Sequence, residues 1–294
     1  MSRIFDALQR SKSEGNGFEF SLESSLTAAP PPATVVETND RATDDLAQFQ
    51  SMAISASPSS RLVCLTDQAS LAAEKFRFLG VRLRQLSQTR SLKKVLITST
   101  IPEEGKTTVS ANLAISLAQR RPQKVLLLEG DLRRPALSSR FGLRQLPGLS
   151  EWLQGGQAAI TGIYHLEEAG LWFLPAGSPP ANPLELMQSE RLTDLMDQLT
   201  EWFDWILIDS PPVVPLADTS VWMRSADGTL MVTREGTTKK RHLQHGLQDL
   251  DRSKMLGVVL NNSSNTDHEN YYQRYGPSPL KSWAKAKTDT QHLV

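Results

Sequence analysis

The sequence predicts an α/β fold: a mostly parallel sheet with helices on both faces. Three observations point to it. Short apolar runs alternate with helical stretches from Arg61 onward, a Gly-Lys-Thr sequence follows one run almost directly, and acidic residues end two others. Continuous apolar strands that alternate with amphipathic helices are typical of parallel sheets buried on both faces.

Seven apolar runs are the expected strands. They are Leu62–Leu65, Lys94–Ser99, Lys124–Glu129, Leu171–Leu174, Trp205–Asp209, Leu230–Thr233 and Leu256–Leu260. Helical spacing of apolar residues is clearest just after the second run, at Val109, Leu113 and Leu117. The first run contains Cys64, which we expect to be a buried strand residue.

Composition excludes several classes of protein. The 32 basic and 32 acidic residues of this 294-residue chain cancel, whereas a nucleic-acid-binding protein usually carries a basic excess. A single cysteine excludes a disulfide within the chain. No apolar run approaches the ~18 residues that a membrane-spanning helix needs, and the first residues lack a signal-peptide pattern. We therefore expect a cytoplasmic protein that does not bind nucleic acid.

Three regions are expected along the chain. Residues 1–60 combine a short amphipathic helix over Met1–Arg10 with a Ser-, Glu-, Gly-, Ala- and Pro-rich linker. Residues 61–265 form the α/β domain, and residues 266–294 form a polar, flexible tail. The first helix is a candidate to dock on a partner or on the inner face of a membrane. A weakly ordered terminal helix is the alternative, since ten residues rarely hold a helix alone.

The segment from Thr100 to Thr108 reads as a P-loop. It lies between a strand and an amphipathic helix, and its Gly105-Lys106-Thr107 core is the sequence whose backbone N–H groups cradle phosphate. Lys106 is expected to reach the β- and γ-phosphates of ATP, and the Thr107 hydroxyl suits Mg²⁺. Glu104, Gly105 and Thr108 complete the expected nucleotide-binding residues of the loop. The pattern has one departure, Thr100 in place of the usual first glycine.

Three carboxylates follow predicted strands. Glu129 and Asp131 follow the third run, and Asp209 ends the run that precedes Ser-Pro-Pro. Because parallel strands present their carboxyl ends on one edge, we expect these groups to converge on the P-loop phosphates.

Four motifs together resemble the bacterial tyrosine kinase (BY-kinase) family, in its CpsD/CapB-like form associated with exopolysaccharide synthesis. They are Pro-Glu-Glu-Gly-Lys-Thr-Thr, Asp-Leu-Arg-Arg-Pro, Leu-Pro-Ala-Gly…Asn-Pro-Leu-Glu-Leu, and Asp-Ser-Pro-Pro. The resemblance covers roughly residues 61–275 and implies a P-loop fold near the ParA/MinD ATPases.

The resemblance implies roles for particular residues. Asp131 and Asp209 hold Mg²⁺ directly or through water. Glu129 stands where the family usually has an aspartate that helps to remove the tyrosine proton. Asn261 or Asn262 lies near the adenine, and we take Asn262 as the site residue.

A cluster of tyrosines lies beyond the last predicted strand. Tyr271, Tyr272 and Tyr275 account for three of the four tyrosines in the chain. In the family such a tail is the autophosphorylation substrate, presented to an adjacent subunit; docking of these rings on a neighbouring surface is the structural alternative. The resemblance also implies a homo-oligomer and a membrane-protein activator of the polysaccharide chain-length or export type.

The oligomerisation motif of the family matches only in part. Glu74 and Arg77 fit Glu-x-x-Arg-x-x-Arg, but Gly80 stands where the second arginine is expected. A solvated helix face with an i,i+3 ion pair is the alternative. The leading prediction is thus an ATP-dependent tyrosine autokinase that controls capsular or exopolysaccharide synthesis. Its rivals are a ParA/MinD-like positioning ATPase and a nucleotide-binding regulatory subunit.

Overall fold

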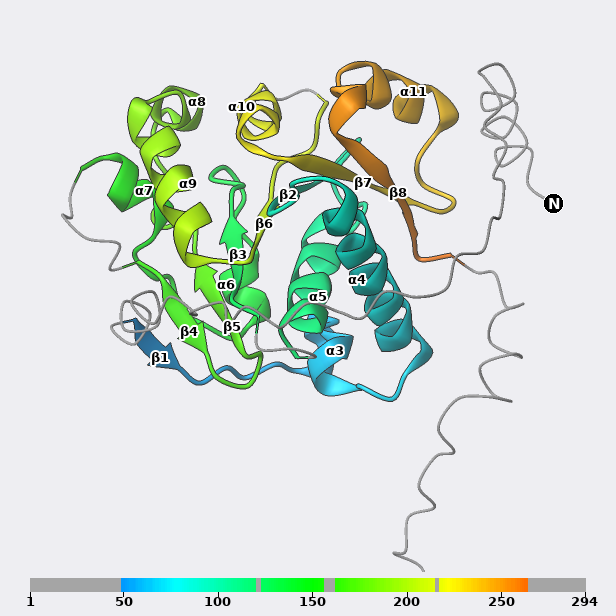
Figure 1. Ribbon diagram of the computed structural model, residues 1–294, viewed down its shortest axis with the longest axis horizontal. Coiled ribbons are helices and arrows are strands. Elements are labelled where there is room, and N and C mark those ends of the chain that lie inside the picture. Colours follow the sequence, from blue (N-terminus) through cyan, green and yellow to red (C-terminus); the bar gives the residue numbers. More distant parts are fainter. Residues whose placement is uncertain (1–48, 120–122, 156–161, 215–216, 264–294) are drawn as a thin grey trace, which may run out of the picture. The chain divides into compact units, whose positions relative to one another are not determined.

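Buried apolar runs form the strands of a single sheet in the computed structural model, which describes residues 49–119, 123–155, 162–214 and 217–263 (Figure 1). Within these ranges the sheet has eight strands. They are β1 (Gln50–Met52), β2 (Lys94–Ser99), β3 (Val125–Glu129), β4 (Tyr164–Leu166), β5 (Leu171–Leu174), β6 (Trp205–Asp209), β7 (Gly228–Arg234) and β8 (Met255–Asn261).

The sheet is mostly parallel, in the order β1-β4-β5-β3-β6-β2-β7-β8. Only the β4–β5 pair is antiparallel among the described strands. The central strands β3 and β6 are buried at every position, as expected for strands covered on both faces. The predicted fold class is confirmed.

Helices cover the two faces of this sheet. One face carries α3 (Val63–Thr66), α4 (Leu71–Thr89), α5 (Lys106–Ala118) and α6 (Leu137–Arg140). The other carries α7 (Leu149–Leu153), α8 (Pro183–Met187), α9 (Glu190–Trp202), α10 (Asp218–Ser225) and α11 (Lys240–Gln248). Successive residues of β3 alternate between the two apolar clusters, as the period of a strand requires. Short 3₁₀ turns occupy Pro58–Ser60 and Arg252–Lys254.

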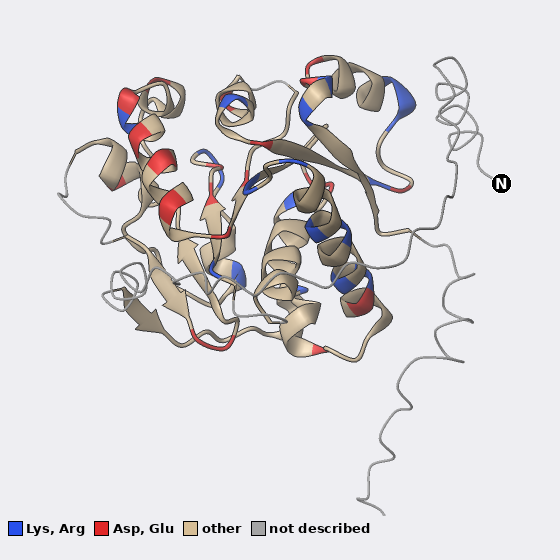
Figure 2. Ribbon diagram, in the orientation of Figure 1, with Lys and Arg blue, Asp and Glu red and all other residues tan. Residues whose placement is uncertain are grey.

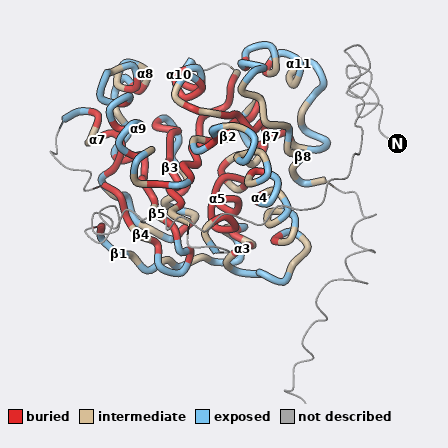
Figure 3. The backbone as a smooth tube through the Cα atoms, viewed as in Figure 1, coloured by how far each residue is buried: buried red, intermediate tan, exposed pale blue. Residues whose placement is uncertain are grey.

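The helices differ in how deeply they are buried. Figure 3 shows α5 buried along most of its length, because α4 covers the side that the sheet does not. The outer faces of α4 and α9 are charged with opposite sign, mainly basic on α4 and acidic on α9 (Figure 2). Both are therefore amphipathic surface helices.

The first predicted strand is wrong. Residues 63–66 of the run form helix α3, which packs on α5, and Cys64 is buried there in a helix rather than in a strand. The Cys64 N–H donates to Asn112 Oδ1 at 3.0 Å, and Asn112 Nδ2 donates to the Arg61 carbonyl at 2.9 Å. A four-residue apolar run cannot distinguish a strand from a short buried helix by periodicity alone.

Two short strands were not predicted. β1 lies within residues assigned to the linker and pairs with β4, which was not predicted either. Each has three residues, too few for an alternating pattern to stand out. Ordered structure therefore begins before the expected boundary at residue 61. Among the described residues, none of the helices has the length and apolar character needed to cross a membrane.

The terminal predictions lie outside the described residues. These are the Met1–Arg10 helix, most of the linker, and the tail with Tyr271, Tyr272 and Tyr275.

Candidate active site

The predicted site residues meet at one edge of the sheet, where the parallel strands β2, β3 and β6 end. Glu129 at the end of β3 pairs in register with Asp209 at the end of β6, and Asp209 pairs in turn with Ile97 of β2. The loop between Thr100 and Lys106 leaves β2 at this edge and leads into α5. The site is therefore built from loops and strand ends on a rigid sheet, as in open α/β folds.

Gly105 and Glu103 give the phosphate loop its bend. Both have positive φ, 93° and 67°, in the left-handed region. A Cβ atom on Gly105 would overlap the side-chain amide of Asn261. Only glycine therefore fits at position 105 with Asn261 where it lies.

The ends of β7 and β8 hold the loop from the other side. The buried Glu104 carboxylate accepts the Ile101 N–H at 2.9 Å and the hydroxyl of Thr238. The Glu104 carbonyl accepts Asn261 Nδ2 at 2.9 Å, and Arg234 Nη1 donates to the Glu103 carbonyl at 3.3 Å. These bonds fix the backbone of the loop before any ligand binds.

Thr100 replaces the first glycine without entering the phosphate site. Its side chain is buried, with the hydroxyl 3.8 Å from the sulfur of Met231. Its methyl lies close to Gly246 of α11, where a Cβ would come within 3.1 Å of it. The threonine therefore serves the packing of α11.

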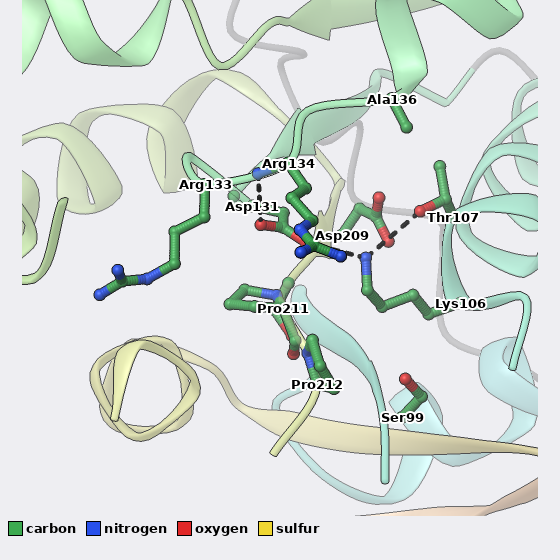
Figure 4. Close-up of polar contacts among 12 residues, drawn as sticks. Ser99, Lys106, Thr107, Asp131, Arg133, Arg134, Ala136, Asp209, Pro211 and Pro212 are labelled. Atoms are coloured by element: carbon green, nitrogen blue, oxygen red, sulfur yellow. Dashed lines mark hydrogen bonds and ion pairs between the residues drawn. The ribbon is translucent and has the colours of Figure 1, made fainter. Parts of the chain in front are cut away.

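Lys106 pairs with Asp131. Lys106 Nζ lies 3.1 Å from Asp131 Oδ2 and 3.4 Å from the Thr107 hydroxyl (Figure 4). Burial alone would lower the pKa of Lys106, but the charges of Asp209 and Asp131 outweigh it and hold the pKa above its usual value. The lysine is cationic and aimed at the space that phosphate oxygens would fill.

Asp209 is buried beside this pair. Its Oδ1 accepts the Ser110 hydroxyl at 2.9 Å, and Thr107 is a second hydroxyl partner. Burial raises the pKa of Asp209, and the nearby Lys106 opposes that rise. Thr107, Asp131 and Asp209 thus present hard oxygen atoms around one lysine.

Glu129 is held differently from the other two carboxylates. Its Oε1 accepts the N–H groups of Ala136 at 2.6 Å and Leu137 at 2.5 Å, and its Oε2 accepts that of Ala176 at 3.2 Å. Burial raises the pKa of Glu129, and these backbone bonds oppose the rise. The longer side chain thus joins the segment after β3 to the segment after β5.

Two further contacts, which the sequence did not reveal, position the Asp131 loop. Arg133 forms a bidentate ion pair with Asp218 of α10, at 2.6 and 3.0 Å. The Trp222 indole N–H donates to the Gly130 carbonyl at 3.0 Å. Each pair joins residues more than 80 positions apart, so no local spacing could have predicted it.

The two candidate asparagines have different surroundings. Asn261 contacts the phosphate loop, whereas Asn262 is exposed, has φ of 55°, and donates its N–H to Asn261 Oδ1 at 2.9 Å. Thr108 is half-buried in the first turn of α5, where its carbonyl accepts Asn112 Nδ2 at 2.8 Å.

The carboxylates do not form a metal site by themselves. Within the described residues, His, Cys, Asp and Glu side chains nowhere gather in threes in a way that could hold a metal ion. Mg²⁺ usually keeps several waters and takes substrate phosphates as ligands, together with one or two carboxylates. Thr107, Asp131 and Asp209 fit that incomplete set.

Comparisons with known proteins identify the family. The model of the CobQ/CobB/MinD/ParA nucleotide binding domain matches residues 95–275. Tyrosine-protein kinase YwqD of Bacillus subtilis is 32% identical over 212 residues, which cover 71% of this chain and 89% of YwqD. The chain belongs to the bacterial tyrosine kinases.

Other tyrosine kinases support this assignment. CpsD of Streptococcus pneumoniae serotype 4 is 36% identical over 173 residues, which cover 58% of this chain and 76% of CpsD. The solved kinase domain of Escherichia coli ETK has a TM-score of 0.64 and 30% identity, with 69% of this chain and 82% of that structure covered. The chimeric protein CapA2B2 has a TM-score of 0.65 and 29% identity, over 77% of this chain and 99% of that structure. The predicted family is confirmed, and the chain is a protein-tyrosine kinase with a nucleotide-binding domain.

The partial oligomerisation motif lies on α4. Glu74 and Arg77 form the i,i+3 ion pair at 2.5 Å. Gly80 is buried, and a Cβ there would lie 3.4 Å from Leu117 of α5. Position 80 faces the neighbouring helix, so an exposed arginine cannot occupy it in this packing.

Proposed function

We propose that this kinase is an ATP-dependent autokinase that transfers the γ-phosphate of ATP to Tyr271, Tyr272 and Tyr275 of a neighbouring copy. The observation that carries the proposal is the meeting of Lys106, Asp131 and Asp209 with Glu129 at one sheet edge. The tyrosine-rich tail, outside the described residues, supplies the acceptor. By analogy with the family resemblance, the process regulated is capsular or exopolysaccharide synthesis at the inner face of the membrane.

Each group has a task in this transfer. Lys106 neutralises phosphate oxygens once it leaves Asp131, and the backbone N–H groups of the loop and of the first turn of α5 hold the phosphates. Mg²⁺, held by Thr107, Asp131 and Asp209, supplies further charge neutralisation. Glu129 accepts the proton of the tyrosine hydroxyl, whose pKa is near ~10 and which is therefore neutral at pH 7. Phosphoryl transfer depends mainly on such positioning and neutralisation.

A mixing experiment tests transfer between copies. The Lys106→Met variant, with an intact tail, is incubated with Mg-ATP and a second variant that keeps Lys106 but carries Tyr→Phe at 271, 272 and 275. We expect phosphotyrosine on the Lys106→Met chain only when the second variant is present. Each variant alone should remain unmodified.

The activator is part of the same proposal. The incubation is therefore repeated with the cytoplasmic segment of a candidate membrane-protein activator. Absence of phosphotyrosine with and without that segment, while ATP is still hydrolysed, would reject the autokinase and favour a ParA/MinD-like ATPase.

A further inference from the structure

A pocket adjoins the carboxylate cluster on the side away from β7 and β8. It has a volume of about 240 Å³ and lies at the carboxyl ends of β3 and β5. Its walls include Pro135, Ser138, Leu143, Leu146 and Pro179, and Glu129 lies at one end. The pocket and the phosphate site share Glu129 as a wall, since Glu129 and Asp209 are register neighbours on adjacent strands.

The strand order places this pocket opposite the nucleoside end of the site. Asn261 lies at the end of β8, beyond β2 and β7, whereas the pocket lies beyond β6 on the other side of the phosphate loop. In phosphoryl transfer the attacking and leaving oxygens lie roughly in line on opposite sides of the phosphorus. A group that attacks the γ-phosphate therefore approaches from the β3–β5 side, where the pocket lies.

Glu129 is a fixed acceptor at the end of the pocket. A carboxylate has about four acceptor positions, and three backbone N–H groups occupy three of those of Glu129. One acceptor position remains on Oε2, which takes only the Ala176 N–H among the printed bonds of the described residues. The donors come from the segments after β3 and β5, so the same bonds that fix the carboxylate also fix the pocket walls.

We propose that this pocket binds the ring of the acceptor tyrosine, with its hydroxyl at Glu129, and so selects tyrosine over serine and threonine. The inference rests on the proposed function and assigns the acceptor residues of that site. Pro135, Leu143, Leu146 and Pro179 offer apolar contact to a ring, and Glu129 offers the one carboxylate. A serine or threonine side chain is too short to fill the apolar part and still reach Glu129.

The charge of the pocket also separates substrate from product. The residues that line it, all within the described part of the chain, include no lysine, arginine or histidine. A neutral phenol fits beside Glu129, whereas phosphotyrosine carries about −1.5 to −2 charges and is repelled. In the step itself the tyrosine oxygen bonds to the γ-phosphorus, the bond from phosphorus to the β–γ bridging oxygen breaks, the proton goes to Glu129, and ADP leaves.

The occupant is a tail tyrosine of a second copy. The fourth tyrosine of the chain, Tyr164, is buried in β4, and its hydroxyl donates to the Pro147 carbonyl at 3.3 Å. The tyrosines that remain are Tyr271, Tyr272 and Tyr275.

Filling the pocket tests the proposal. The acceptor is a synthetic peptide with the sequence of residues 269–276, and the enzyme is the full chain with Tyr→Phe at 271, 272 and 275. Adding Ser138→Phe should lower kcat/KM for the peptide by about 10-fold or more, the scale of discrimination by an apolar pocket. Mg-ADP affinity should not change. The control, Ser225→Phe, fills a different pocket, beside Lys94 and Leu192, and should leave peptide phosphorylation unchanged.

Two additional measurements keep the outcomes distinct. Pro179→Glu, at an exposed position at the pocket mouth, should lower the peptide rate without affecting folding. Fluorescence anisotropy measures peptide binding without transfer. Binding that Ser138→Phe abolishes, in an enzyme that transfers no phosphate, would support the pocket and reject the autokinase. Equal phosphorylation by the Ser138→Phe and Ser225→Phe enzymes, or no peptide binding to the unfilled pocket, would overturn the pocket assignment.

Discussion

At the residue scale, the site is a cluster of buried charges that only partly balance one another. Lys106 pairs with Asp131, while Asp209 and Glu129 are buried close to them. Burying a charge is unfavourable unless it is paired and hydrogen-bonded. The site is thus arranged for a ligand at the expense of the stability of the free protein, a common compromise in enzymes.

Asp209→Asn should stabilise the free protein. Burial raises the pKa of Asp209 above its value in the unfolded chain, so the ionised form opposes folding at every pH above the folded-state pKa. The expected rise in Tm at pH 7 is about 2–4 °C for each kcal/mol relieved. The difference from the parent protein should shrink as the pH falls through the folded-state pKa and the carboxyl becomes neutral. Thermal unfolding as a function of pH measures both.

The matched control for this prediction is Ser110→Ala. It removes the hydroxyl that donates to Asp209 and leaves the charge, so the Tm should fall. A lower Tm for Asp209→Asn at pH 7 would contradict the argument that its charge destabilises the fold. Mg²⁺-dependent nucleotide binding should weaken in Asp209→Asn in any case, because a proposed metal ligand is lost.

Local patterns at the residue scale place the site but not its supporting contacts. The position of Lys106, Asp131 and Asp209 at one sheet edge follows from their places after apolar runs. The backbone bonds of Glu129 do not, because they depend on how the segments after β3 and β5 fold. Likewise, Asn261 and Thr238 reach the phosphate loop from distant parts of the chain.

At the element scale, the β3–Asp131 loop is fixed by close packing against α10. Trp222 is fully buried, and its ring lies where a side chain on Gly130 would be. A Cβ at position 130 would come within 2.8 Å of the indole. The carboxylate loop therefore depends on a glycine in the Glu-Gly-Asp sequence.

Gly130→Ala should destabilise the protein by about 1–3 kcal/mol, the usual range for overpacking a core. Gly80→Ala is the matched control, because position 80 lies inside α4 with its nearest neighbour at an ordinary 3.4 Å. Alanine there should stabilise by about 0.5–1 kcal/mol through helix propensity. Urea unfolding of both variants measures the difference. Equal stability of Gly130→Ala and the parent protein would show that Trp222 can move aside.

The elements were predictable where the pattern is long and continuous. The ranges predicted for β2, β5 and β6 match the observed strands, because apolar runs in buried parallel strands are uninterrupted. β1 and β4 are too short to show a pattern, and α3 has the same apolar run that a strand would have. Tertiary contacts with Asn112 and Gln119 decide that α3 is a helix packed on α5.

At the scale of the whole domain, α5 links the nucleotide site to the core. Its first residue is Lys106, and its buried length packs against the sheet, α3 and α4. Cys64 on α3 is bonded to α5 through its own backbone, with its N–H on Asn112 and its carbonyl on Gln119. Exposure of Cys64 therefore requires α3 to separate from a helix whose first turn holds phosphate.

The reactivity of Cys64 should accordingly report nucleotide binding. Cys64 is the one cysteine of the chain; it is buried, and burial raises the pKa of its thiol to about 12. Alkylation near pH 8 must then wait for unfolding. Ligand that binds only the folded state at 100 times its dissociation constant stabilises by about 2.7 kcal/mol, so Mg-ADP at that level should slow labelling about 100-fold. Lys106→Met should lose most of this protection. Labelling that Mg-ADP does not slow would mean that α3 opens locally, without unfolding the nucleotide site.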